Sequence, residues 1–212
     1  MKRKITALKV NQWLKDWDKY DYDEKQRRKK PEPCFYVFKL SAPQLKALSG
    51  IFRRTSVDKE KGFVENIQRA HEAERSAKIK KFIRFGYPFS DLNQPKINSG
   101  EYENLKKPGW LPTAIIINIL KKGDIRLGKH KVEEKDLIKI ENESEEIASV
   151  ILPETFTGEL KWTPKELHPI EVIDGQHRLW AFEDDRETKE FELPVVAFYG
   201  LDISWQAYLF WS

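Results

Sequence analysis

The sequence has a single cysteine, Cys34, and only four histidines among its 212 residues. A disulfide within the chain is therefore excluded, and no Cys/His spacing typical of a zinc site can be drawn. No apolar run reaches the eighteen or more residues that a membrane-spanning helix needs, and no apolar leader follows Met1. We therefore expect a cytoplasmic protein without a membrane partner, and neither a thiol enzyme nor a zinc enzyme.

Charge of one sign is not in large excess either. The chain has 38 lysines and arginines against 34 aspartates and glutamates, which gives a net charge of +4. This balance permits contact with DNA but lacks the concentrated basicity of a DNA-coating protein. A hydrophobic content of 40% at this length is enough to build the core of one domain.

The first 33 residues differ in pattern from the rest. Leu8, Trp13 and Trp17 recur at roughly helical spacing, which predicts an amphipathic helix over residues 5–20. Residues 21–33 are charged and include the basic run Arg27 to Lys30, so we interpret them as a solvated linker. The alternative is an arm that contacts nucleic-acid phosphates. We therefore divide the chain into an N-terminal helix with a charged linker, residues 1–33, and a main domain, residues 34–212.

The main domain mixes apolar strand-like runs with helical periodicity, which predicts an α+β fold around a mixed sheet. Strands are predicted at 34–40, 113–120, 147–152, 169–173 and 193–199, and helices at 42–49, 65–85, 176–182 and 203–212. Residues 139–146 are acidic, and we expect them to be exposed.

A near-match to a phosphate-binding P-loop spans Gly123 to His130. His130 stands where a serine or threonine would hold Mg²⁺, and residues 131–135 lack the apolar face of the helix that must follow a P-loop. We therefore interpret Lys122 to Asp124 as the turn of a hairpin, in which residues 125–127 return alongside the strand at 113–120.

The strongest candidate site is Asp174-Gly175-Gln176-His177-Arg178, where a buried strand ends and a helix begins. Gly175 permits a tight turn, and the first N–H groups of a helix have no intrahelical acceptor, so they attract anions. Gln176, His177 and Arg178 add side-chain donors. A carboxylate repels phosphate unless a cation lies between them, so Asp174 is a candidate Mg²⁺ ligand. The alternative is that Asp174 only caps the helix while His177 and Arg178 face solvent.

The segment Val172 to Phe182 resembles the signature of the DGQHR-domain proteins, the DndB and DpdB type associated with bacterial phosphorothioate and 7-deazaguanine DNA modification. The resemblance implies a ParB/sulfiredoxin-like fold over residues 34–212. Gly175, His177 and Arg178 match the phosphate loop of sulfiredoxin. Gln176 replaces the sulfiredoxin cysteine, so repair of sulfinic acids is not expected.

The resemblance further implies that Gly175, Gln176, His177 and Arg178 bind the phosphates of ATP or another nucleoside triphosphate, with Mg²⁺ on Asp174. Asp174 and His177 are then the candidate catalytic residues of an ATPase that works with DNA-modification enzyme subunits. The alternatives are a DNA-binding regulator of a modification operon and an inert interaction scaffold. Residues 203–212 are apolar and lack a helix-ending signal, so we also expect the domain to be truncated at its C-terminal end.

Overall fold

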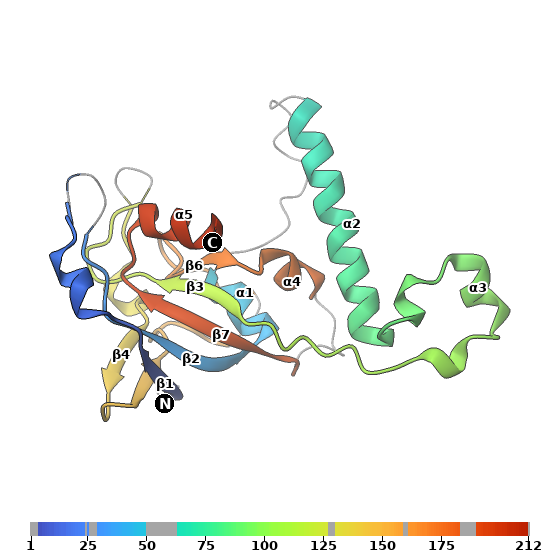
Figure 1. The fold of residues 1–212 in the computed structure, drawn as a ribbon, viewed down its shortest axis with the longest axis horizontal. Coiled ribbons are helices and arrows are strands. Elements are labelled where there is room, and N and C mark those ends of the chain that lie inside the picture. Colours follow the sequence, from blue (N-terminus) through green and yellow to red (C-terminus); the bar gives the residue numbers. More distant parts are fainter. Residues whose placement is uncertain are drawn as a thin grey trace.

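The computed structural model describes residues 4–23, 25, 29–49, 63–126, 130–158, 161–182 and 190–211, with the backbone alone for 63–73 and 211. Within these ranges the chain forms a mixed sheet in the order β4-β5-β1-β2-β7-β3-β6, accompanied by helices (Figure 1). The strands are β1 (Lys4–Asn11), β2 (Cys34–Ser41), β3 (Ile115–Ile119), β4 (Lys139–Asn142), β5 (Ile147–Ile151), β6 (Ile170–Asp174) and β7 (Glu192–Tyr199). The α-helices are α1 (Ala42–Ser49), α2 (Phe63–Phe85), α3 (Gln94–Ser99), α4 (Gln176–Ala181) and α5 (Ile203–Trp211). The predicted α+β class with a mixed sheet is confirmed.

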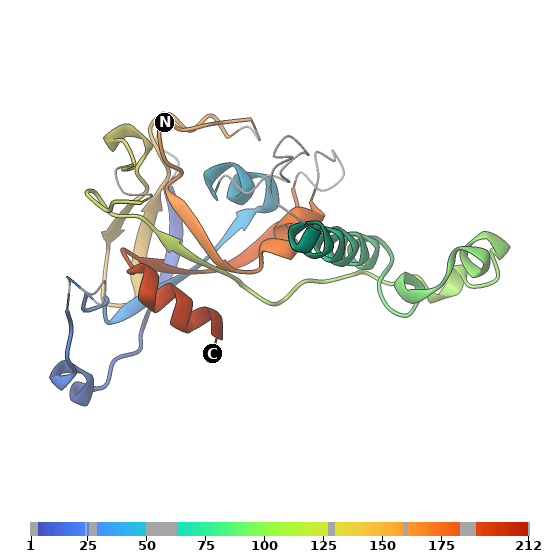
Figure 2. The same cartoon turned by 90° about the horizontal axis from the view of Figure 1, so that it is seen from above.

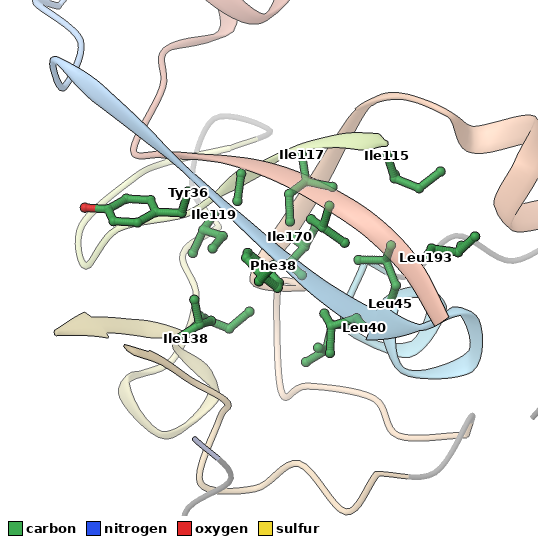
Figure 3. Packing of buried hydrophobic residues seen from close by; sticks show 14 of the residues in the cluster. Tyr36, Phe38, Leu40, Leu45, Ile115, Ile117, Ile119, Ile138, Ile170 and Leu193 are labelled. Atoms are coloured by element: carbon green, nitrogen blue, oxygen red, sulfur yellow. The ribbon is translucent and has the colours of Figure 1, made fainter. Parts of the chain in front are cut away.

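One face of the sheet carries the hydrophobic core, because successive side chains of a strand point to opposite faces. In β2 the alternate residues Tyr36, Phe38 and Leu40 are buried, and in β3 Ile115 and Ile117 are completely buried. Figure 3 shows these side chains converging from several strands on the same interior. Each such aliphatic or aromatic side chain contributes about 1.5–3 kcal/mol when it leaves water.

Helices cover both faces of the sheet. Leu45 of α1 belongs to the core cluster, so α1 lies on the core face. Asn118 of β3 points to the other face, where its amide oxygen accepts a hydrogen bond from the Leu201 N–H, just before α5. Seen from above, α1 and α5 accordingly lie on opposite sides of the sheet (Figure 2). The motif strand β6 is therefore enclosed between layers even though it stands at one end of the strand order.

The helix predicted for residues 5–20 is wrong. Residues 4–11 form β1, which pairs antiparallel with both β2 and β5, and a short 3-10 helix, η1 (Lys15–Lys19), follows. The tryptophans that suggested helical spacing, Trp13 and Trp17, instead pack edge to face, with ring centroids 5.4 Å apart. The N-terminal residues are thus part of the same sheet as residues 34–199.

One further prediction fails in the strand pairing. The chain turns at Lys121–Asp124, but the neighbours of β3 are β7 and β6. Among the described residues of the return segment, the pairing is an isolated bridge between Arg126 and His130. The exposure predicted for residues 139–146 is confirmed for 141–146, and residues 139–142 in addition form β4 through pairing with β5. Residues 127–129 lie outside the described part of the chain, but residues 131–138 contain only a 3-10 turn and no α-helix, in agreement with the rejection of a P-loop.

The helix α2 and the segment after it extend away from the sheet (Figures 1 and 2). Residues 86–112 leave the end of α2, form the short helix α3 and return to the start of β3. We call this segment the arm. Its base is closed where the Lys107 N–H donates to the Phe85 carbonyl at 2.8 Å, beside Gly86. Among the described residues, no helix has the length and apolar character required to cross a membrane.

Candidate functional site

The candidate site begins where β6 ends at Asp174. β6 pairs antiparallel with β3, which itself runs parallel to β7, so the motif is attached to the interior of the sheet through β3. A register shift between Ile116 and Ile117 of β3 lies opposite the end of β6. Ile173 is the additional residue of β6 at this shift, and pairing resumes at Asp174, directly before the turn at Gly175.

Gly175 is required at this turn for two reasons. Its φ of 97° lies in the left-handed region, which side chains disfavour. A Cβ at this position would also lie 2.6 Å from Cδ1 of Ile115 and 2.9 Å from Nη2 of Arg178. Glycine therefore lets the backbone of the motif pack directly against β3 and the Arg178 side chain.

Arg178 does not face solvent as the alternative reading of the motif supposed. Its Nη1 donates to the carbonyl oxygen of Thr113 and, at 3.0 Å, to that of Ala114, and its Nη2 donates to Asp174 Oδ2 at 3.2 Å. Only 14% of the side chain is exposed. Of the five guanidinium N–H groups, the remaining two have no hydrogen-bond partner among the described residues.

Asp174 does not cap α4, as the alternative interpretation supposed. The N-cap of α4 is Gly175, and no side chain caps the helix. The Asp174 side chain is 55% exposed while one of its oxygens accepts from Arg178. No group of three or more His, Cys, Asp or Glu residues with metal-site geometry occurs among the described residues. Magnesium fits Asp174 only in the manner of nucleotide sites, where one or two carboxylates, water and the phosphates themselves complete the coordination.

The other motif residues lie on the first turns of α4. Gln176 is its first residue and is half-buried. The His177 ring packs edge to face on Trp180 with centroids 5.1 Å apart, and its Nδ1 atom is buried. The structure thus brings Asp174 and Arg178 into direct contact and places His177 against the aromatic side of α4.

The role of Arg75 is open from the sequence, and in the structure its charge acts on Arg178. α2 packs along α4, and Arg75 is an exposed residue of α2. Burial lowers the pKa of Arg178, and the Arg75 charge lowers it further, while Asp174 opposes both effects. The charge of Arg75 therefore acts on the same guanidinium that Asp174 holds. The sequence could not predict this effect, because helical periodicity does not show which exposed arginine of α2 lies towards α4.

The helix dipole contributes less than the sequence suggested. α4 contains only six residues, so few peptide dipoles align behind the N–H groups of Gln176 and His177.

A second polar cluster lies on the α5 face of the sheet. Glu171 of β6 forms a two-bond ion pair with Arg126, at 2.6 and 2.9 Å, and also accepts from Asn118 and Gln206. Burial alone would raise the pKa of Glu171, but the hydrogen bonds from Arg126, Gln206 and Asn118 outweigh it and hold this pKa below its ordinary value. These bonds join β3, β6 and α5, and they fix α5 on the sheet.

The basic run Arg27 to Lys30, the alternative phosphate-contacting segment near the N-terminus, is described only in part. Arg27 and Arg28 lie outside the described residues. The Lys30 ammonium is 2.5 Å from Asp18 and lies 5.3 Å from the centroid of the Trp13 ring. Lys30 thus contributes to the packing of the N-terminal segment.

Comparison of the chain with protein-family models, with curated proteins and with solved structures gives no match in any of the three.

Proposed function

We propose that this chain binds ATP or another nucleoside triphosphate with Mg²⁺ at the β6–α4 junction. The observation that carries the proposal is the largely enclosed Arg178 guanidinium, in which two N–H groups have no hydrogen-bond partner among the described residues. The exposed Arg75 adds a second positive charge that acts on Arg178. Arginine matches the geometry of phosphate oxygens, and two arginines provide more positive charge than Asp174 neutralises.

The two arginines have different roles in this proposal. Arg178 is held in place by Thr113, Ala114 and Asp174, so its guanidinium is fixed before a ligand arrives. Such preorganisation reduces the entropy lost on binding. Arg75 is exposed on α2, and its long side chain can adjust to the position of the phosphate. Asp174 would repel phosphate alone, and it becomes favourable when Mg²⁺ lies between the carboxylate and the phosphate oxygens.

We further propose that the bound nucleotide is hydrolysed, with Asp174 and His177 as catalytic residues. The proposal also includes a ParB/sulfiredoxin-like fold and a role as the partner of a DNA-modification enzyme. These steps rest on the resemblance of residues 172–182 to the DGQHR signature. The role proposed for Asp174 is to hold Mg²⁺, which would polarise the phosphate, and Arg178 would stabilise the charge that develops there.

The experiment is a melting-temperature series with Mg²⁺ and ATP or CTP. A ligand that binds only the folded state stabilises it by roughly 2.7 kcal/mol at one hundred times its dissociation constant. For a chain of this size that is a rise of roughly 5–10 °C. The variant Arg75→Ala is expected to reduce the rise, whereas Arg84→Ala on the same helix is a matched control and should retain it. The absence of a rise with either nucleotide in a folded protein would contradict the proposal.

A DNA-binding regulator stays the second candidate, because residues 74–112 contain eight lysines and arginines against four acidic residues. Part of this charge is already paired, as in Lys106 with Glu103 at 2.5 Å. Binding to several DNA phosphates would weaken steeply as salt concentration rises. A flat or absent salt response in a DNA titration would remove this candidate.

A further inference from the structure

Trp110 is the most exposed large hydrophobic side chain among the described residues, with 78% of its surface accessible. Tryptophan is highly buried on average because of its large apolar area, so this exposure is unusual. It is also not the result of a loosely placed backbone. The preceding residue, Gly109, is packed so closely on α2 that a Cβ there would lie 1.8 Å from the Phe82 carbonyl oxygen.

The position of Trp110 relates it to the two arginines. Arg75 precedes Phe82 on α2 by about 10 Å along the helix axis, at 1.5 Å per residue. In the other direction, Thr113 follows Trp110 within about 10 Å of chain, and its carbonyl oxygen accepts from Arg178. Trp110 is therefore attached on one side to the helix that carries Arg75 and on the other to the backbone that Arg178 holds.

We propose that Trp110 is the platform on which the base of the bound nucleotide stacks, while Arg75 and Arg178 hold its phosphates. The inference rests on the proposed function and names the ligand class more closely: a nucleoside triphosphate, and not an inorganic polyphosphate. An exposed indole held on a fixed backbone provides a flat apolar surface for a base without reorganisation of the protein.

Stacking also sets the specificity that the site can have. Every base presents a π-face, so an aromatic platform tolerates different bases. A purine covers more of an indole than a pyrimidine does, and apolar stabilisation grows with the area removed from water. Trp110 is therefore expected to favour ATP and GTP over CTP and UTP by a modest factor, without strict selection of one base.

The test compares ATP with tripolyphosphate, each with Mg²⁺, by calorimetric titration of the wild-type protein, Trp110→Ala and Trp110→Phe. Loss of one base stack weakens binding by about 5- to 150-fold. Trp110→Ala should lose affinity for ATP by this factor, Trp110→Phe by less, and neither should change the affinity for tripolyphosphate. Tyr87→Ala removes another exposed aromatic side chain of the arm, 65% accessible, and should leave both affinities unchanged.

The outcomes separate this inference from the proposed function. If ATP and tripolyphosphate bind equally well and Trp110→Ala changes neither, the platform is overturned and the phosphate site stands. If Trp110→Ala weakens both ligands alike, Trp110 acts only through the structure of the arm, and the inference is again overturned. If the folded wild-type protein binds neither ligand, the proposed function itself fails.

Discussion

The guanidinium of Arg178 donates a 3.0 Å hydrogen bond to the carbonyl oxygen of Ala114, across sixty-four positions of the chain. The bond ties the first turns of α4 to the backbone that leads from the arm into β3. Asp174 holds the same guanidinium from the other side. One side chain therefore fixes the geometry of the motif and, in our proposal, presents donors to phosphate.

Replacing Arg178 should affect stability as well as binding. Arg178→Ala removes the hydrogen bonds to the Thr113 and Ala114 carbonyl oxygens and to Asp174, and a hydrogen bond of this kind contributes about 0.5–1.5 kcal/mol. Arg75→Ala removes an exposed side chain and should change the free energy of unfolding by less than about 0.5 kcal/mol. Urea unfolding of both variants measures the difference. Equal stability of the two variants would contradict the structural role of Arg178.

Gly175 and Gly100 offer a matched pair of substitutions, since both have positive φ, 97° and 73°. A Cβ at Gly100 meets nothing within 4 Å, whereas one at Gly175 meets Ile115 and Arg178. Gly100→Ala should cost only the backbone strain, about 1–2 kcal/mol. Gly175→Ala adds overpacking and should cost about 3 kcal/mol or more.

Thermal or urea unfolding of the two glycine variants decides the point. If Gly175→Ala is no more destabilising than Gly100→Ala, the motif backbone at Gly175 does not pack closely against Ile115 and Arg178.

The Glu171 cluster predicts a pH dependence of stability. The pKa of Glu171 is lowered in the folded protein, so its stabilising contribution is present above the unfolded pKa of about 4.3 and is lost as pH falls through the lower folded value. Glu171→Gln should destabilise the protein by about 1–3 kcal/mol at pH 7, because the charged hydrogen bonds with Arg126 are weakened. Below pH 4 the difference between variant and wild type should shrink.

Unfolding free energies measured between pH 3 and pH 7 test this expectation. A variant whose deficit stays constant over the whole range would show that the Glu171 charge does not contribute to the attachment of α5.

The proposed magnesium role of Asp174 predicts a change of sign. Without metal, Asp174→Asn removes a negative charge near the phosphates and should raise the affinity for ATP. With saturating Mg²⁺ the same substitution removes a metal ligand and should lower the affinity. Asparagine keeps an oxygen that can accept from Arg178, so the structure of the motif is retained.

Titrations of ATP with Mg²⁺ and with EDTA, on wild type and Asp174→Asn, provide the comparison. An equal effect of the substitution on ATP affinity with Mg²⁺ and with EDTA would show that Asp174 does not bind Mg²⁺.

Much of the fold could be predicted because it follows local patterns. The apolar run at 113–120, the glycine in the strand-to-helix turn at Gly175 and the helical periodicity up to Phe85 all correspond to elements of the structure. β1 was mistaken for a helix because Trp13 and Trp17 mimic helical spacing, while its strand conformation depends on pairing with β5, far along the chain. β4 is short and acidic, and it too depends on a partner strand.

The candidate site could be predicted only as a segment. The glycine turn and the donors of residues 174–178 are legible, since turn and helix-start chemistry is local. The acceptors of Arg178 are backbone carbonyl oxygens at Thr113 and Ala114, which no side-chain pattern reveals. The charge of Arg75 acts on Arg178. Arg75 belongs to α2, which packs on α4, and this packing is likewise a tertiary contact.

The most direct test of the central claim is a calorimetric titration of the wild-type protein with ATP in the presence of Mg²⁺, repeated with Arg75→Ala. Our account predicts saturable binding at one site per chain, weakened in Arg75→Ala while circular dichroism and unfolding remain as in the wild type. Absence of binding heat at millimolar nucleotide, together with no change in melting temperature, would show that the β6–α4 junction is not a nucleotide site.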